Sequence, residues 1–304
     1  MTLSIVIVHY NTPVELIKCL RSVTQYLGDI NFEVIVVDNC SVDRTIENFK
    51  KEFPWVGFYF MKENLGYAKA NNFAVNKSTG DFILLLNPDT ELIEDCISPM
   101  LKFLEDNPAA GACGPMLVYK DGRFQNSCGG RMGIFYEIAE ALMFINLYRR
   151  IWRMNKINLK NNLHPVKVGW LSGACILVNR KLYEEVGGFS NKYFLNYEDI
   201  DLCARIEEKF FLNYYFPNLR CIHLDQTSQK KNYEGLVFTR YQSRLIYAKF
   251  HYNTVLSVFV RLIHIVGILL RLALVNFIYR NSERSERYAG YKRAFKLYTG
   301  LKRI

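Results

Sequence analysis

The sequence predicts an α/β protein with a mostly parallel central sheet flanked by helices, and two observations carry this prediction. Apolar runs of five or six residues alternate with helical stretches over the first 90 residues. These runs are apolar throughout, which is typical of strands covered by helices on both faces. The chain has 304 residues and is 50% hydrophobic, so it can bury the core that this architecture needs.

The first half of the chain is expected to hold four strands that each end in small or polar residues. Parallel sheets bind their ligands beyond the carboxyl ends of the strands. Asn, Asp, Gly and Pro are also common turn formers, but four such ends in succession favour one shared polar site. The predicted strands are 3–8, 33–37, 56–61 and 82–86, and helices are expected at about 14–26, at 45–51 and in the stretch that ends at Gly80.

The pattern changes after Gly111 and predicts a mixture of strands, loops and helices. Residues 134–152 are predicted to be helical and amphipathic, as an insertion into the α/β pattern. Residues 168–180 are predicted to form a strand with small residues at its centre, and 194–208 a loop that runs into a helix.

Charge and cysteine usage narrow the class of protein. Residues 251–304 hold ten Lys or Arg and two acids, so +8 of the net charge of +10 lies there. A basic tail typically meets nucleic acid or an anionic membrane.

The eight cysteines are scattered and form no CxxC pair, so the spacing of a zinc site is absent and the pattern fits a reducing cytosol. The start, MTLSIVIVHYN, is expected to be a strand rather than a secretory signal.

Six short motifs occur in a fixed order over about residues 3–225: SIVIVHYN, VIVVDNCSVDRT, NLGYAKANN, LLLNPDT, WLSGACILV and NYEDIDLCAR. In these motifs the sequence resembles the family 2 glycosyltransferases of the Rossmann-like GT-A fold, and most of all their bacterial rhamnosyltransferase-like branch. The resemblance implies an inverting transferase that moves a sugar from a nucleoside diphosphate to a hydroxyl of a glycan or polyprenyl-linked glycan. Rhamnose from dTDP-rhamnose is the candidate donor, with UDP-sugars as the other class, and bacterial surface polysaccharide and cell-wall synthesis is the implied setting.

The metal motif of this family is Asp-any-Asp after the fourth strand, and the chain has Asn87-Pro88-Asp89 there. The resemblance implies that Asp89 binds a divalent cation, Mg²⁺ or Mn²⁺, together with donor phosphate oxygens, and that His223 is a second ligand. Asn87 can orient or hydrogen-bond the donor but adds no charge. The alternatives are that Asp89 is a turn residue and that His223 is a partly buried histidine at a strand end.

The resemblance also places the donor nucleotide. Asp38 would accept a hydrogen bond from an imide N–H of the base, Tyr10 would stack on the base, and Gly66 would allow close approach of the backbone to phosphate. A plain turn is the alternative for Gly66. The full set of implied nucleotide-sugar contacts is Tyr10, Thr12, Asp38, Asn64, Gly66, Asn71 and Asn87.

Catalysis by direct displacement needs a base within reach of the acceptor hydroxyl. The resemblance implies that Asp199 is this base, and Glu198 is its acidic neighbour and a further catalytic candidate. The alternative is that Asp199 and Asp201 favour a helix N-terminus. Asp201 would bind the acceptor or pair with Arg205 four residues later. The acceptor-side residues implied by the resemblance are Trp170, Ser172, Gly173 and Asp201, although a tryptophan is more often a core residue.

The sequence suggests a catalytic domain over residues 1–250 and a basic amphipathic tail over 251–304. Residues 254–279 are long enough to cross a bilayer, but Arg261, His264 and Arg271 divide the run. We therefore expect a helix that lies in the membrane interface, with 280–303 facing anionic lipid. A spanning helix and an ordinary core helix are the alternatives, and nucleic acid is the least favoured partner. The expected location is the cytoplasmic, inner face of the cell membrane.

Two other functions compete with transfer. A non-catalytic member could bind nucleotide and scaffold a glycan-assembly complex, and Asn87 in place of Asp keeps this alternative open. A sugar-nucleotide nucleotidylyltransferase shares the sheet but needs a glycine-rich basic loop after the first strand, where this chain has HYNTPVE.

Overall fold

The computed structural model describes residues 2–27, 30–42, 46, 49–156, 163–224, 232–278 and 281–300. The chain forms two compact units. Unit 1 comprises 1–131, 156–191 and 198–228, and unit 2 comprises 132–155, 192–197 and 229–304. The predicted α/β class is confirmed in unit 1, whereas the predicted boundary after residue 250 stays a prediction.

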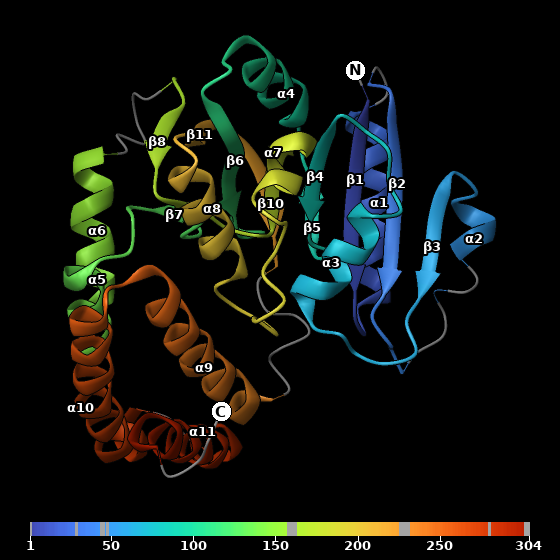
Figure 1. Cartoon of the computed structure of the whole chain (residues 1–304). Helices are drawn as coiled ribbons and strands as arrows, with labels where there is room; N and C mark the ends of the chain where they lie inside the picture. Colours follow the sequence, from blue (N-terminus) through green and yellow to red (C-terminus); the bar gives the residue numbers. More distant parts are fainter. Residues whose placement is uncertain are drawn as a thin grey trace. The chain divides into compact units, whose positions relative to one another are not determined.

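Unit 1 is built on a nine-stranded mixed sheet (Figure 1). The strand order is β3-β2-β1-β4-β10-β6-β11-β5, and β8 pairs with β11. The strands are β1 (Leu3–His9), β2 (Phe32–Asp38), β3 (Val56–Phe60), β4 (Phe82–Leu86), β5 (Thr90–Leu92), β6 (Ala110–Val118), β8 (Val166–Val168), β10 (Cys175–Asn179) and β11 (Leu212–His223). A separate pair joins β7 (Cys128–Gly129) to β9 (Trp170–Leu171).

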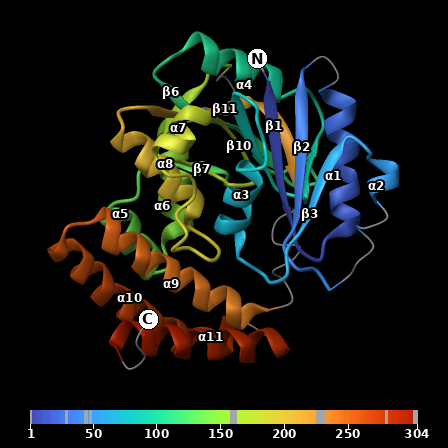
Figure 2. The same cartoon turned by 45° about the vertical axis from the view of Figure 1, so that its right-hand side comes forward.

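The four strands predicted in the first half are confirmed and pair in parallel. Their uniform apolar character follows from burial on both faces, since every residue of β1 and β4 is buried. Figures 1 and 2 show α3 in front of this part of the sheet, with the strands' carboxyl ends pointing downward in Figure 1. The helices here are α1 (Pro13–Tyr26), α2 (Phe49–Glu52), α3 (Tyr67–Val75) and α4 (Ile97–Asp106). Part of the helix predicted at 45–51, including Thr45, lies outside the described residues.

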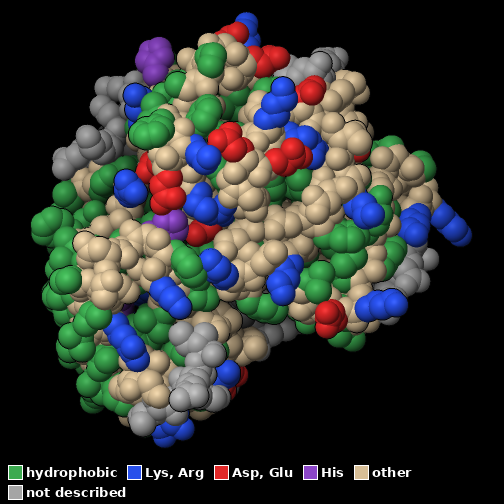
Figure 3. Space-filling view, in the orientation of Figure 1, with side chains coloured by type: hydrophobic (Ala, Val, Ile, Leu, Met, Phe, Trp, Pro, Cys, Tyr) green, Lys and Arg blue, Asp and Glu red, His purple; other side chains and the backbone are tan. Residues whose placement is uncertain are grey.

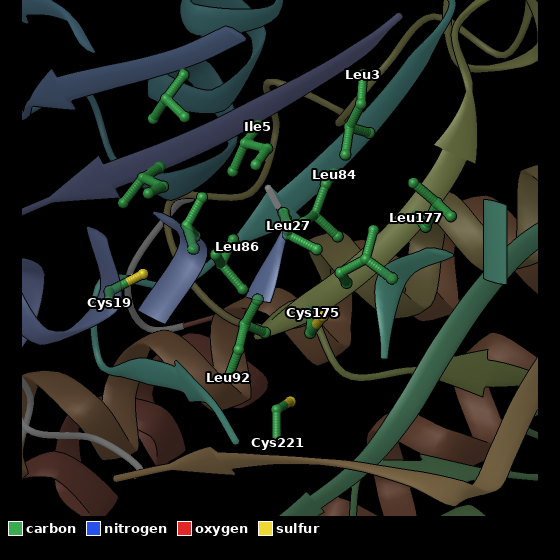
Figure 4. Close-up of a cluster of buried hydrophobic side chains, with 14 of the residues drawn as sticks. Leu3, Ile5, Cys19, Leu27, Leu84, Leu86, Leu92, Cys175, Leu177 and Cys221 are labelled. Atoms are coloured by element: carbon green, nitrogen blue, oxygen red, sulfur yellow. The ribbon is translucent and has the colours of Figure 1, made fainter. Parts of the chain in front are cut away.

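The core of unit 1 lies between one face of the sheet and helices α1 and α4. Alternate residues of β1 and β4 point into it, as the two-residue period of a strand requires. Figure 4 shows the leucine, isoleucine and cysteine side chains that meet there, among them Leu3, Ile5, Cys19, Leu84, Leu86, Cys175 and Cys221. All eight cysteines carry free thiols, and seven of them are buried; Cys40 is half-buried.

One sequence prediction in the second half is wrong in detail. Residues 168–180 do not form one strand, because a turn at Ser172–Ala174 separates β9 from β10. Residues 134–152 are helical as predicted, in two helices, α5 (Ile134–Ala141) and α6 (Ile145–Lys156), because Met143 between them has a positive φ of 68° that a continuous helix cannot contain. The predicted loop that runs into a helix is confirmed, and this helix is α8 (Glu198–Glu208). The short helix α7 (Arg180–Glu185) is followed by Gly187 and Gly188.

Unit 2 is helical. Besides α5 and α6 it contains α9 (Tyr233–His251), α10 (Thr254–Ile278) and α11 (Asn281–Thr299), drawn orange to red in Figure 1. α10 contacts α5, α9 and α11. The shared core is apolar and aromatic, and its members are Val237, Tyr241, Ile268, Val275, Tyr291, Ala294 and Tyr298.

The ionisable residues that interrupt the apolar sequence of α10 are bound by other parts of unit 2. The Nε2 atom of His264 lies 2.8 Å from Glu137 Oε2, and Arg271 donates to the carbonyl oxygens of Glu140 and Ala141 at the end of α5. Arg261 donates to the carbonyl of Tyr298. The polar positions of the helix therefore hold unit 2 together.

Candidate active site

The carboxyl ends of β1 and β2 form the first part of the site. Asp38 is 3% exposed; its Oδ2 accepts from the backbone N–H of Ser41, and its Oδ1 lies 3.8 Å from His9 Nε2. In the described part of the chain no hydrogen bond reaches Asp38 Oδ1. His9 Nδ1 lies 3.1 Å from the hydroxyl of Thr12, which is also buried. Asp38 thus retains one acceptor oxygen, and Tyr10, which follows His9 in the chain, is half-buried.

Asn39 joins this strand end to the next loop. Its Oδ1 accepts from the N–H of Leu65, and its Nδ2 donates to Asn64 Oδ1 at 3.0 Å and approaches the carbonyl of Gly66 at 3.4 Å. Gly66 has a φ of 79°, which glycine adopts at little cost, and it precedes the first turn of α3. Asn71 lies further along α3 and donates to the backbone carbonyl of Tyr67.

Asp89 and His223 meet at the end of β4. Asp89 Oδ1 lies 3.3 Å from His223 Nε2, and about a tenth of each side chain is exposed. Asn87 Nδ2 lies 3.4 Å from the same nitrogen. The register of β11 against β5 places His223 opposite Thr90, which explains how residues far apart in sequence come together.

Two further side chains hold this cluster in place. Gln125 is 7% exposed, and its Oε1 lies 2.8 Å from His223 Nδ1. The hydroxyl of Tyr67 lies 2.9 Å from both Asn87 Oδ1 and the carbonyl oxygen of Gly173. Burial raises the pKa of Tyr67 well above its usual value, and the charges of Glu198 and Asp199 add to this effect. Tyr67 therefore remains a hydrogen-bond donor.

Asp199 is held at the start of α8. Its Oδ2 accepts from the N–H of Gly173 and its Oδ1 from the N–H of Ile200, both at 2.8 Å. The two residues before α8, Asn196 and Tyr197, have positive φ values of 68° and 73°. Such conformations are costly for residues other than glycine and often occur at functional sites.

Glu198 and Asp199 share one environment but differ in their partners. Burial, and then the neighbouring charge of Asp199, raise the pKa of Glu198 well above its usual value. Burial also raises the pKa of Asp199, although two backbone N–H groups oppose the shift. No hydrogen bond from the described residues reaches Glu198 Oε2. Asp199 accepts hydrogen bonds from the N–H groups of Gly173 and Ile200, whereas Glu198 Oε2 accepts none from the described residues, so we expect Glu198 to keep its proton to a higher pH than Asp199 does.

Of the four predicted acceptor residues, Ser172 and Gly173 lie next to Asp199, whereas Trp170 and Asp201 are engaged in other contacts. Gly173 and Ser172 lie in the turn that contacts Asp199, and the Ser172 N–H donates to the carbonyl of Ser127. Trp170 is 7% exposed and packs against Gly129, so most of its ring is used in packing. Asp201 is buried and bound by Arg205 through two nitrogen atoms at 2.6 and 2.8 Å. Contacts of Trp170 and Asp201 with an acceptor stay predictions.

Four residues of this region were missed as candidate site residues from the sequence: His9, Asn39, Tyr67 and Gln125. His9 and Asn39 were visible as polar residues at strand ends, and that position could have marked them. Tyr67 lies inside the NLGYAKANN motif, which could have marked it, whereas Gln125 carries no local signal because its partner His223 becomes a neighbour only through the sheet.

The donor atoms fit a hard divalent cation that is also held by a substrate. Among the described residues no group of three or more His, Cys, Asp or Glu could hold a metal ion. Asp89 and His223 supply one carboxylate and one imidazole, and a cation such as Mg²⁺ is commonly bound by one or two carboxylates together with substrate phosphates. The site thus fits a cation that binds with its donor substrate.

Comparison with known proteins identifies the family. The pattern of "Glycosyl transferase family 2" matches residues 4–187, which is more than half of the chain. The chain belongs to this family. This glycosyltransferase is 29% identical over 203 residues to the N-acetylglucosaminyl-diphospho-decaprenol L-rhamnosyltransferase of Mycobacterium tuberculosis, covering 62% of the chain and 66% of that protein, just under two thirds. It is 24% identical to the dTDP-rhamnosyl transferase RfbF of Shigella flexneri, covering 72% of the chain and 67% of that protein.

Solved structures share the fold of the glycosyltransferase. The mannosyltransferase PcManGT from Pyrobaculum calidifontis, solved with GDP-Man and Mn²⁺, has a TM-score of 0.56 at 16% identity and covers 98% of the chain and 84% of its own. TarS 1–349 of S. aureus, solved with UDP-GlcNAc, has a TM-score of 0.56 at 14% identity and covers 97% and 82%. The predicted GT-A fold and rhamnosyltransferase-like resemblance are therefore confirmed.

Proposed function

We propose that this family 2 glycosyltransferase is an inverting enzyme that transfers a sugar, with rhamnose from dTDP-rhamnose as the favoured donor, to a hydroxyl of a glycan or polyprenyl-linked glycan. One observation carries the proposal. Asp199 accepts from the N–H of Gly173, and the carbonyl of Gly173 lies beside Tyr67, which reaches Asn87. The candidate base and the candidate cation ligands are thus linked through one residue and one hydroxyl. The likeness to two rhamnosyltransferases supports the choice of sugar.

Each part of the site has a separate task in this proposal. Asp38 and the loop around Asn64 and Gly66 would bind the nucleotide, with Asp38 Oδ1 accepting from the base. Asp89 and His223 would hold a divalent cation, which when bound neutralises charge on the departing diphosphate. Asp199 would accept the proton of the acceptor hydroxyl as that oxygen attacks the sugar carbon, and displacement from the opposite face inverts the configuration.

The raised pKa of Asp199 sets the expected pH dependence. A base must be deprotonated to act, so the transfer rate should fall as pH drops through this raised pKa. The acidic limb should therefore lie above the ordinary aspartate pKa of 3.8. Proton release by Asp199 at neutral pH is favoured by its two N–H donors.

Two substitutions test the transfer proposal. Asp199→Asn keeps the size of the side chain but removes the base, and we expect transfer to fall by about 10²–10⁴-fold with donor binding unchanged. Asp89→Ala should abolish Mn²⁺-dependent binding of the nucleoside diphosphate. Radiolabelled transfer from a panel of dTDP- and UDP-sugars and calorimetric binding give the two readouts. Near-normal transfer by Asp199→Asn would place the base elsewhere, and binding without turnover in the wild type would favour a scaffold.

We further propose that α10 and α11 attach the protein to the cytoplasmic face of an anionic membrane. One helix in the described chain, Thr254–Phe277, is long and apolar enough to cross a bilayer, and this alone is weak support. Its exposed residues recur every three or four positions and form a stripe that Figure 3 shows as green side chains along the left edge. The stripe comprises Val255, Val258, Phe259, Leu262, Val266, Leu269, Leu270, Leu274 and Phe277.

Two features favour an interfacial helix over a spanning one. His264 and Arg271 are bound to α5, so α10 is packed on one side by protein. On α11 the exposed residues Arg284, Lys292 and Lys296 follow one another at intervals of eight and four positions, which places them toward one side of the helix. Each such cation near an anionic surface contributes about 1 kcal/mol of binding.

Vesicle flotation tests the membrane proposal. Val258 and Leu262 are 52% and 58% exposed, so replacing both with Glu should leave the fold intact and release the protein from phosphatidylglycerol-containing vesicles. Phe210→Glu, at a 94% exposed position of unit 1, is the matched control and should not change flotation. High salt should weaken attachment of the wild type. Attachment that survives both salt and carbonate would indicate a spanning helix instead.

A further inference from the structure

Three side chains converge at the end of β4 with a spacing that suits a shared cation. His223 Nε2 lies 3.3 Å from Asp89 Oδ1 and 3.4 Å from Asn87 Nδ2. In an octahedral site with ligands at 2.0–2.1 Å, neighbouring ligand atoms are about 3.0 Å apart. Small side-chain movements would bring the three groups into that range. Whether they can bind a cation then depends on whether His223 offers a lone pair and Asn87 its amide oxygen.

Gln125 decides which nitrogen of His223 is available. A neutral imidazole carries a proton on one nitrogen and a lone pair on the other. Gln125 Oε1 lies 2.8 Å from Nδ1, and a carbonyl oxygen accepts, so Nδ1 carries the proton. The backbone N–H of Gln125 donates to Leu117, which fixes the residue beside β6. The lone pair of His223 Nε2 is then directed toward Asp89.

Tyr67 acts in the same way on Asn87. Its hydroxyl is 2.9 Å from Asn87 Oδ1 and 2.9 Å from Gly173 O, yet it has one proton to donate. In the metal-free arrangement Asn87 Nδ2 faces His223 Nε2 and Asn87 Oδ1 accepts from Tyr67. With a cation bound, a half-turn of the Asn87 carboxamide would let Tyr67 donate to Gly173 and accept from Asn87 Nδ2. Asn87 Oδ1 then points toward His223 and Asp89 and can serve as a neutral oxygen ligand.

We propose that Gln125 and Tyr67 are positioning residues for the cation site: Gln125 holds the Nε2 lone pair of His223, and Tyr67 holds the carbonyl oxygen of Asn87, toward the ion. This inference rests on the proposed cation-dependent transfer. It explains how a chain with Asn in place of the first motif Asp can still offer three ligand atoms. Groups that orient metal ligands typically contribute 10–100-fold to metal affinity.

The tautomer of His223 tests the Gln125 arm directly. In ¹⁵N-histidine NMR spectra of the metal-free wild type, assigned with His223→Gln, we expect the Nδ1–H form. Gln125→Met, which has a similar size but lacks the carbonyl, should shift the population toward Nε2–H, and Gln125→Glu should restore Nδ1–H. A wild-type imidazole protonated on Nε2 would overturn this arm whatever the activity.

Mn²⁺ affinity, measured by EPR with and without dTDP, tests both arms. Gln125→Met and Tyr67→Phe should each weaken Mn²⁺ binding about 10–100-fold, and Gln125→Glu should bind at least as tightly as the wild type. Ser127→Ala and Tyr183→Phe are the matched controls. Ser127 is a buried hydroxyl near Gln125, and the hydroxyl of Tyr183 binds the unrelated Asn72. Both controls should keep wild-type affinity.

The outcomes separate this inference from the proposed function. If Asp89→Ala abolishes Mn²⁺ binding but Gln125→Met and Tyr67→Phe do not weaken it, the positioning roles are wrong while cation-dependent transfer stands. If the wild type binds no Mn²⁺ even with dTDP, the proposed cation use fails, and the positioning roles fail with it. Equal losses in the variants and the controls would indicate a general loss of structure, which also contradicts specific positioning.

Discussion

Glu137 in unit 2 and Glu198 in unit 1 are both buried, 0% and 6% exposed, yet they have opposite environments. Glu137 is contacted by His264, Arg244 and Tyr252, and its pKa is lowered because these partners outweigh its burial. Glu198 has an oxygen that no described residue reaches, and burial raises its pKa. The carboxylate that stabilises unit 2 is surrounded by donors, whereas the one in the proposed active site is left with capacity for another partner.

The largest change in stability should come from substituting Glu137, whose partners are His264, Arg244 and Tyr252. Glu137→Gln removes the charge opposite the buried guanidinium of Arg244, which is 2% exposed. Removing one partner of a buried ion pair typically costs about 3–5 kcal/mol. Chemical denaturation monitored by circular dichroism should show this loss. A cost below about 1 kcal/mol would mean that water or another group takes over the role of the carboxylate.

Glu198→Gln should change the stability of the fold by less than Glu137→Gln does, and it should raise the stability at neutral and alkaline pH. A raised pKa means that the folded state binds the proton more tightly than the unfolded chain, so the stability from Glu198 is present below pH 4.5 and lost as pH rises toward the raised value. Each pKa unit corresponds to about 1.4 kcal/mol. The variant should match the wild type near pH 4 and melt at a higher temperature at pH 8. A variant that is less stable at pH 8 would contradict a protonated Glu198.

The smallest effect is expected at an exposed ion pair of unit 1. Arg21 and Glu52 lie 2.8 Å apart, but their side chains are 66% and 43% exposed. Exposed pairs contribute about 0–1 kcal/mol. Glu52→Gln should therefore change the unfolding free energy by less than about 1 kcal/mol, and added salt should reduce even this difference. A large change would show that contact distance outweighs burial in this protein.

The sequence predicted the parallel half of the fold and most of the candidate site because both depend on local patterns. An apolar run followed by a polar residue marks a strand and its end, as at Asp38 and Asp89. The antiparallel strand β10 and the long β11 were harder, because their partners are set by tertiary pairing. Gln125 acts on a residue that only the sheet brings near, so no spacing in the chain could reveal it. Likewise, His264 looked like an interruption of an apolar helix until its partner Glu137 was known.

The half-buried Cys40 offers a practical route to observing donor binding. It is the one cysteine of the eight that is not buried, and it lies two residues after Asp38, next to the expected base pocket. A maleimide dye should therefore label the native enzyme at a single thiol without any engineered cysteine. Because that dye would stand close to Asp38 in the proposed nucleotide site, its emission could report occupancy in real time, and the same label could be used to screen nucleotide sugars.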